Sequence, residues 1–332
     1  MQKLAEYEAV DDAAFAAIRA AAEPAVLRGL VADWPVVASG LAGALGPYLS
    51  AMATDQPVPM VRATAAEQGR LHYDAALTGP NFAREPTTIA RFFAKVGRQT
   101  DASAPDTLAI QAIPAGLLPG FSETNPLPLR AVAVEPRLWL GTAAVVATHH
   151  DQVENVACVA AGHRRFTLFA PEQVSNLYMG PFHITPAGTA VSMAHVTAPD
   201  LDRYPRFADA LAEARQADLA PGDAIYIPYG WYHHVEALSP INLLVNYWWN
   251  PARPDLGSPW DAMMHGMAAL RHLPPDQRRS WRAMFDHYVF AAGGDPAAHL
   301  PPAARGILGA ESAEDLATMR RSIVAALQRT KP

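Results

Sequence analysis

Two histidine-rich stretches of the chain have the residue types and spacing of a metal site. The first, residues 148–151, contains His149 and Asp151 separated by one residue. If this stretch lies on a β-strand, the two side chains project from the same face, because side chains alternate with a period of two. The second stretch, residues 231–234, contains two adjacent histidines, either of which can supply a third ligand. Two imidazoles and one carboxylate form a facial triad with open coordination positions, which is typical of non-haem Fe(II) oxygenases.

The segments around both stretches have the pattern of short strands separated by turns. Residues 155–171 predict a strand, a turn at Gly162, a second strand and a proline stop. Apolar runs at residues 224–227 and 241–249 flank the second stretch. Many short strands spaced by turns, in a chain with 30 prolines, predict a jelly roll.

In these segments the sequence resembles the JmjC/cupin-like 2-oxoglutarate oxygenases, specifically the small hydroxylases that include the asparaginyl hydroxylase of hypoxia-inducible factor. The resemblance runs from about residue 25 to residue 249 and is strongest at 148–171 and 221–249. It implies a mainly β fold with helices, built as a double-stranded β-helix (jelly-roll) core with an N-terminal α/β flank and a C-terminal helical region. The expected regions are 1–105 for the flank, 106–250 for the core and 251–332 for the C-terminal helices.

The resemblance also implies which residues bind the metal. Matching positions within the family assigns Fe(II) to His149, Asp151 and His233, because the family's third ligand follows an aromatic residue by two positions. The neighbouring His150 and His234 are expected to point to the opposite faces of their strands and to leave the metal unbound.

The resemblance also implies a cation that binds the co-substrate. Arg164 stands where family members commonly carry a lysine that binds the distal carboxylate of 2-oxoglutarate. Arginine is permanently charged and binds carboxylates through two N–H groups, so the replacement keeps the chemistry. Arg165 is expected to point the other way. The remaining positions that match the family's pocket are Asn155, Asn246 and Trp248. The implied reaction uses 2-oxoglutarate and O2 and couples oxidative decarboxylation to hydroxylation of a C–H bond.

Two positions depart from the family pattern. Val146 stands where the family often has serine or threonine, and Ala109 stands near the position of a tyrosine hydroxyl that contacts the co-substrate. Neither side chain can donate a hydrogen bond. Tyr226 and Thr167 are the candidates to replace the missing hydroxyls.

Two other classes of protein remain open. A non-catalytic, metal- or ligand-binding cupin-like regulatory protein would account for Val146 and Ala109. Such a protein could lose its metal ligands without penalty, so the presence of His149, Asp151 and His233 argues against it. A cupin isomerase or dioxygenase that uses no 2-oxoglutarate would need another ligand near the first motif, where Glu154 is the nearby candidate. Succinate release that depends on 2-oxoglutarate would separate the oxygenase from both.

The composition excludes several classes of protein. The chain has 332 residues, of which 50% are hydrophobic and 17% are charged, so a large core is possible. A net charge of −6 gives no electrostatic case for nucleic acid, and one cysteine excludes an internal disulfide. The N-terminus lacks the apolar core of a signal peptide, and no stretch approaches the about 18 apolar residues of a membrane span. We therefore expect a cytoplasmic protein, and the family resemblance implies that its substrate is a protein side chain or a small molecule.

The region after residue 250 predicts helices rather than strands. In the helix that begins near residue 275, apolar side chains recur at i, i+3, i+4, i+7 and i+8. They are Trp281, Met284, Phe285, Tyr288 and Val289, hereafter the apolar stripe. So wide an apolar face predicts a homodimer through the C-terminal helices, as related hydroxylases often form, unless the stripe docks on its own core.

Overall fold

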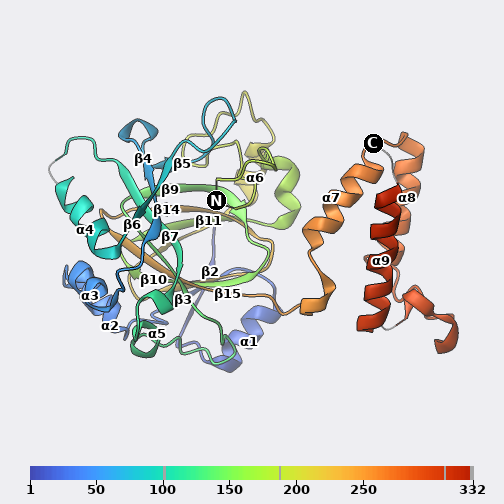
Figure 1. The fold of residues 1–332 in the computed structure, drawn as a ribbon, viewed down its shortest axis with the longest axis horizontal. Coiled ribbons are helices and arrows are strands. Elements are labelled where there is room, and N and C mark those ends of the chain that lie inside the picture. Colours follow the sequence, from blue (N-terminus) through green and yellow to red (C-terminus); the bar gives the residue numbers. More distant parts are fainter. Residues whose placement is uncertain (100–101, 187, 310–311, 330–332) are drawn as a thin grey trace. The chain divides into compact units, whose positions relative to one another are not determined.

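The strands of residues 1–250 form two β-sheets (Figure 1). The computed structural model describes residues 1–99, 102–186, 188–309 and 312–329. Within these residues the sheets have six and nine strands. Residues 251–332 form a second unit, which is described by itself below. The prediction of a mainly β core with helices is confirmed.

The smaller sheet carries both histidine stretches. Its strands are β1 (Gln2–Lys3), β5 (Arg70–Leu71), β9 (Ala144–His150), β11 (Arg164–Phe169), β12 (Arg215–Leu219) and β14 (Tyr232–Ala237). Their order in the sheet is β1-β12-β11-β14-β9-β5. Because β14 pairs antiparallel with β9, His233 lies directly opposite His149. Backbone pairing therefore brings the two distant stretches together.

The larger sheet provides the opposite wall. Its strands are β2 (Ala5–Glu8), β3 (Ala25–Arg28), β4 (Val58–Ala63), β6 (Ala83–Thr87), β7 (Thr107–Pro114), β8 (Arg137–Gly141), β10 (Glu154–Ala161), β13 (Ala224–Ile227) and β15 (Asn242–Trp249). Their order is β2-β3-β13-β10-β15-β8-β7-β4-β6. Every residue of the central strand β10 is buried, as expected for a strand that is covered on both faces.

A hydrophobic cluster, hereafter the inter-sheet core, lies between the two sheets. Its members include Phe166, Leu168 and Val235 from the smaller sheet and Ala157, Val159, Ile225, Ile227 and Leu244 from the larger sheet. The alternate residues of β10, such as Val156 and Cys158, belong to a second cluster on the outer face of the larger sheet. Two facing sheets with this alternation make the expected double-stranded β-helix.

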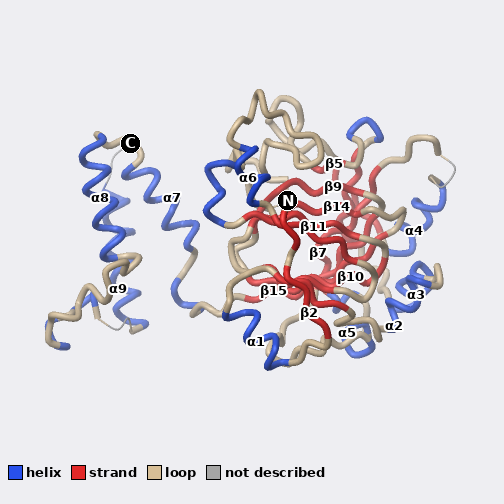
Figure 2. The backbone as a smooth tube through the Cα atoms, turned by 180° about the vertical axis from the view of Figure 1, so that it is seen from behind, coloured by secondary structure: helices blue, strands red, loops and turns tan. Residues whose placement is uncertain are grey.

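Helices cover the outer faces of the sheets (Figure 2). They are α1 (Asp12–Ala20), α2 (Pro35–Leu41), α3 (Leu45–Met52), α4 (Ile89–Arg98), α5 (Phe121–Thr124) and α6 (Phe207–Glu213). The first five contribute buried side chains to the cluster on the outer face of the larger sheet. Helix α6 packs with Phe169 and Tyr232 on the outer face of the smaller sheet. Helix α1 begins where acidic residues predict it, since the Asp11 side chain accepts a hydrogen bond from the Ala14 amide at 2.8 Å.

The second unit consists of helices that bury very few side chains. Its helices are α7 (Pro259–Leu270), α8 (Pro275–Tyr288) and α9 (Ala313–Arg329). Residues 310–311 and 330–332 of the expected helical region lie outside the described residues. In the part of this unit that is described, Ala297 alone is buried. Over all described residues of the chain, no helix has both the length and the apolar character needed to cross a membrane.

Candidate active site

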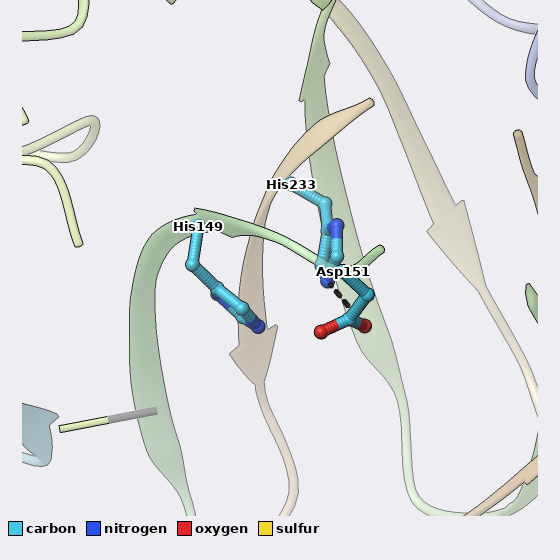
Figure 3. Close-up of side chains that lie close together, drawn as sticks. All are labelled: His149, Asp151 and His233. Carbon is cyan, nitrogen blue, oxygen red and sulfur yellow. Dashed lines mark ion pairs between the residues drawn. The ribbon is translucent and has the colours of Figure 1, made fainter. Parts of the chain in front are cut away.

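His149, Asp151 and His233 converge on one point (Figure 3). Each offers one ligand atom, and these atoms lie within 4.8 Å of one another. The centroids of the two imidazole rings are 4.4 Å apart, and His233 Nε2 lies 3.7 Å from Asp151 Oδ2. No other group of three or more His, Cys, Asp or Glu side chains has this geometry in the residues described. The structure thus brings together the three residues predicted as metal ligands.

Backbone carbonyls orient the two imidazole rings. His149 Nδ1 lies 2.8 Å from the Ala147 carbonyl oxygen, and His233 Nδ1 lies 3.2 Å from the Trp231 carbonyl oxygen. A carbonyl oxygen only accepts a hydrogen bond, so Nδ1 carries the proton in each neutral ring and Nε2 keeps its lone pair. Metal-binding histidines are commonly held in this way.

Burial keeps His233 in the form that binds metals. Its side chain is 6% exposed. Burial and the neighbouring His149 lower the pKa of His233 to about 4, although the Asp151 carboxylate acts in the opposite direction. A metal binds the neutral imidazole. At pH 7 His233 therefore needs to lose no proton before it can bind a cation.

The adjacent histidines lie outside this ligand group. The ring of His150 packs 4.8 Å from that of Tyr232, a residue of the cluster beneath α6. His234 lies 4.0 Å from the Glu236 carboxylate, on the outer face of β14. Strand alternation accounts for both positions, because each residue is next in sequence to one that faces inward.

Arg164 is a buried cation beside the inter-sheet core. It shares a strand face with Phe166 and Leu168 of that core. Its side chain is 7% exposed, and its Nε has no hydrogen-bond partner among the described residues. Burial lowers the pKa of Arg164 to about 10, so the guanidinium remains charged at pH 7. A buried, uncompensated charge is strongly unfavourable, so the position suits an anionic ligand.

The neighbouring Arg165 has a different environment. Its guanidinium forms an ion pair with the Asp218 carboxylate, with Nε 2.7 Å from Oδ1, on the surface of the smaller sheet. Arg165 is thus already paired, and its side chain does not share the inward face of Arg164.

Asn155, Asn246 and Trp248 also face the space between the sheets. Asn155 lies opposite Trp248, and Asn246 lies opposite Ala157 of the inter-sheet core. Asn246 Nδ2 donates a hydrogen bond to Asn155 Oδ1 at 3.0 Å. Within the described part of the chain, Asn246 Oδ1 and Trp248 Nε1 are buried without a partner. Buried polar atoms are normally paired, so these two atoms also point to a ligand.

One residue of this surface was missed by the sequence interpretation. Trp139 packs edge-on against Trp248, with ring centroids 5.8 Å apart. Its Nε1 is buried and finds no acceptor among the residues that the structure describes. The signal that could have identified it is the alternation in β8, where Leu138 and Leu140 face the outer cluster and Trp139 faces the inter-sheet core.

The prediction that Tyr226 or Thr167 replaces the missing hydroxyls is wrong. The Tyr226 hydroxyl donates to Glu154 Oε2 at 2.8 Å, and its ring belongs to the outer cluster of the larger sheet. Thr167 lies opposite His234, on the outer face of the smaller sheet, and its hydroxyl accepts a hydrogen bond from Gln216 Nε2 at 3.0 Å. Strand alternation directs both hydroxyls away from the inter-sheet core.

Glu154 is likewise wrong as an additional metal ligand. Both of its carboxylate oxygens accept hydrogen bonds from the Arg19 guanidinium at 2.8 Å. Burial disfavours the ionised form, but the Arg19 and Tyr226 hydrogen bonds outweigh it and lower the pKa of Glu154. The further ligand expected of a cupin that works without 2-oxoglutarate is therefore engaged elsewhere.

Comparison with known proteins agrees with the fold that the structure shows. The sequence profile of the family described as "Cupin-like domain" matches residues 11–254. The lysine-specific demethylase JMJ31 of Arabidopsis thaliana is 33% identical over 112 residues, which cover 33% of this chain and 20% of the relative. HSPB1-associated protein 1 of Homo sapiens is 34% identical over 117 residues, which cover 34% of this chain and 23% of the relative. The bifunctional peptidase and (3S)-lysyl hydroxylase JMJD7 of Homo sapiens is 31% identical over 155 residues, which cover 40% of this chain and 48% of the relative. The matched part of the chain thus spans between a fifth and a half of these relatives.

Proposed function

Because the chain belongs to the cupin-like domain family, we propose that it is an Fe(II)- and 2-oxoglutarate-dependent oxygenase that hydroxylates a protein side chain or a small molecule. The observation that carries this proposal is the convergence of His149, Asp151 and His233 within 4.8 Å. A ligand set of two histidines and one carboxylate leaves coordination positions open for a co-substrate and O2. Relatives that are named as a demethylase and a hydroxylase support the same class of enzyme.

In this proposal the chain holds the metal with two histidines on paired strands and one aspartate that follows a strand end. His149 and His233 are fixed by their strands and by the carbonyls that accept their Nδ1 protons. Asp151 follows the end of β9, and its backbone carbonyl accepts a hydrogen bond from the Gly230 amide at 3.3 Å. Bound iron would supply the activation of O2 that is coupled to decarboxylation of 2-oxoglutarate.

The co-substrate is proposed to lie along the inner face of the smaller sheet. Arg164 lies opposite Ala237, whereas Leu168 lies opposite His233, so Arg164 is four residues away from the level of His233. That separation corresponds to about 13 Å along the strand. The long Arg164 side chain can reach back over part of this span and bind the distal carboxylate, while Asn155, Asn246 and Trp248 contact the keto-acid end.

A protein side chain is the substrate class that the comparisons favour. Two relatives carry lysine in their names, as a lysine-specific demethylase and a lysyl hydroxylase. A net charge of −6 is compatible with a basic protein segment as substrate. The single cysteine, Cys158, is buried and unpaired, which is compatible with the cytoplasmic location that we propose.

We further propose that the chain has three functional regions: a flank at 1–105, the site-bearing core at 106–250, and a homodimer interface formed by residues 251–332. Apart from the half-buried Phe285, the residues of the apolar stripe are exposed in this unit: Trp281 is 41% exposed and Tyr288 is 54% exposed. A groove of about 590 Å³ is lined by Trp281, Phe285 and Val289 of the stripe and by residues of α7 that include Met263 and Met267. Apolar surface of this kind marks an interaction site, and a two-fold contact between identical chains is the commonest way to cover it.

A turnover assay tests the proposed activity. The purified chain is incubated with Fe(II), O2 and 2-oxoglutarate, alone and with a panel of lysine-containing peptides and metabolites, and succinate is measured. The oxygenase proposal predicts succinate that depends on 2-oxoglutarate and is lost in Asp151→Ala. Iron binding without succinate, under every substrate, would instead support a non-catalytic cupin-like regulatory protein. The absence of hydroxyls at Val146 and Ala109 favours that second candidate.

A further inference from the structure

Two indole N–H groups beside the inter-sheet core lack acceptors. Nε1 of Trp139 and Nε1 of Trp248 are both buried without a hydrogen-bond partner in the described structure. A third buried indole, that of Trp34, has an acceptor: its Nε1 donates a hydrogen bond to the Pro126 carbonyl oxygen at 2.8 Å. An indole N–H can only donate, so Trp139 and Trp248 each need an acceptor that the residues described by the structure do not provide.

The positions of the two indoles differ along the strands of the larger sheet. Trp248 lies opposite Asn155, whereas Trp139 lies opposite Leu244, four residues earlier on β15. Four residues correspond to about 13 Å along a strand. The two rings nevertheless meet edge to face, so the pair extends from the proposed keto-acid end of the pocket to a more distant level.

Trp139 is connected to both positions where the expected hydroxyls are missing, through a shared hydrophobic cluster and a shared sheet face. Val146 packs against the inter-sheet core, as does Trp139. Ala109 lies opposite Gly141, which is two residues from Trp139 and therefore on the same face of β8. The donors expected from positions 146 and 109 are thus absent from the same region in which the Trp139 N–H lacks an acceptor among the described residues.

We propose that Trp139 Nε1–H donates a hydrogen bond to the distal carboxylate of 2-oxoglutarate beside Arg164, in place of the hydroxyls that Val146 and Ala109 lack. This inference rests on the proposed function. A carboxylate has two oxygens and about four acceptor sites, so it can take a bidentate guanidinium and a further N–H. Trp139 is then a specificity-determining residue that selects a co-substrate with a second carboxylate.

A pair of ligands separates this role from a purely structural one. 2-Oxoglutarate carries the distal carboxylate, whereas 2-oxopentanoate has the same five-carbon chain and ends in a methyl group. The Zn(II)-loaded protein is titrated with each ligand by calorimetry, for the wild type and for Trp139→Phe, which keeps an aromatic ring and removes the N–H. We expect the Kd for 2-oxoglutarate to rise about tenfold, as for the loss of one charge-assisted hydrogen bond, and the Kd for 2-oxopentanoate to change less than about twofold.

Trp34→Phe is the matched control. It removes a buried indole N–H whose acceptor is the Pro126 carbonyl, so it should leave the affinities for both ligands unchanged. Equal weakening of both ligands in Trp139→Phe would show that Trp139 only shapes the pocket and would overturn the inference. An unchanged Kd for 2-oxoglutarate would overturn it as well.

A measurement on the wild type keeps the test independent of how well the variant folds. The indole ¹⁵N–¹H signals of the Zn(II)-loaded protein are recorded with each ligand. A hydrogen bond to a carboxylate predicts that the Trp139 signal moves downfield with 2-oxoglutarate and not with 2-oxopentanoate; identical spectra would refute it. If the wild type binds no 2-oxoglutarate at all, the proposed function itself fails. If it binds 2-oxoglutarate while Trp139 is unaffected, only the role of Trp139 fails.

Discussion

His233 lies directly opposite His149 where β14 pairs with β9, and the centroids of their rings are 4.4 Å apart. One antiparallel register therefore sets the distance between the two imidazoles of the candidate metal site. Both rings present Nε2 because their Nδ1 atoms are held by carbonyls two residues earlier. The site depends on strand pairing for its spacing and on local hydrogen bonds for its orientation.

The first prediction concerns the carboxylate of the metal site. Asp151→Ala should abolish stoichiometric Fe(II) binding, because it removes a direct ligand, and even supporting residues around a metal contribute about 10–100-fold to affinity. Iron content is measured by mass spectrometry after anaerobic loading and desalting. His150→Ala is the control and should leave iron content largely intact, since its ring packs on Tyr232. Equal iron content in Asp151→Ala and the wild type would sink the assignment.

The second prediction concerns the buried cation. Arg164→Met should raise the Kd for 2-oxoglutarate by at least about tenfold, because it removes the charge proposed to bind the distal carboxylate. Arg165→Met is the matched control and should leave this Kd unchanged, since Arg165 is paired with Asp218. Calorimetry on the Zn(II)-loaded protein measures both. A normal Kd in Arg164→Met would mean that the co-substrate is anchored elsewhere.

The third prediction concerns the C-terminal helices. The wild type should be a dimer at about tens of micromolar, a concentration well above the Kd of a stable pair. Met284→Glu with Tyr288→Glu should give a monomer by light scattering, because each charge would have to enter an apolar interface. Arg279→Glu, on the opposite side of α8, should leave the dimer intact. A monomeric wild type contradicts the idea, and a dimer that resists both charges places the interface elsewhere.

The fourth prediction is a pH dependence of stability. Burial acts to raise the pKa of Glu154, but the hydrogen bonds from Arg19 and Tyr226 outweigh it and hold that pKa below its usual range. A carboxyl with a lowered folded-state pKa stabilises the fold above its unfolded pKa, and this contribution is lost as the pH falls through the folded pKa. Glu154→Gln should therefore reduce the free energy of unfolding by about 2 kcal/mol at pH 7. The difference from the wild type should shrink below about pH 4.5.

Urea unfolding of both proteins at pH 7 and at pH 3.5, about one unit below the usual carboxyl pKa, provides the measurement. Glu172→Gln, at an exposed position, should give a difference from the wild type that stays near zero at both pH values. A Glu154→Gln difference that is equally large at both pH values would show that packing, rather than the ionised carboxylate, stabilises this cluster.

The sequence could predict those features that depend on short spacing. His149 and Asp151 needed only a strand and its period of two, and the same alternation separated His233 from His234 once the family pattern indicated which one faces inward. Which face of a strand looks inward is harder to predict when both faces are buried. All four residues of β13 are buried, so nothing in its composition showed that Tyr226 faces the helices rather than the site. Trp139 was missed for a related reason, since its free N–H is visible only once its surroundings are known.

Burial of the Arg164 guanidinium affects the stability of the whole protein. No ion pair of Arg164 is found among the described residues, and a buried guanidinium without a counter-charge makes a fold less stable than the same fold with that charge neutralised. Any dianion that binds there raises the free energy of unfolding, by about 2.7 kcal/mol when its free concentration is a hundred times its Kd. A higher concentration of such a small metabolite would then increase the resistance of the protein to heat and to proteolysis. The lifetime of the chain in a cell would therefore depend on that concentration.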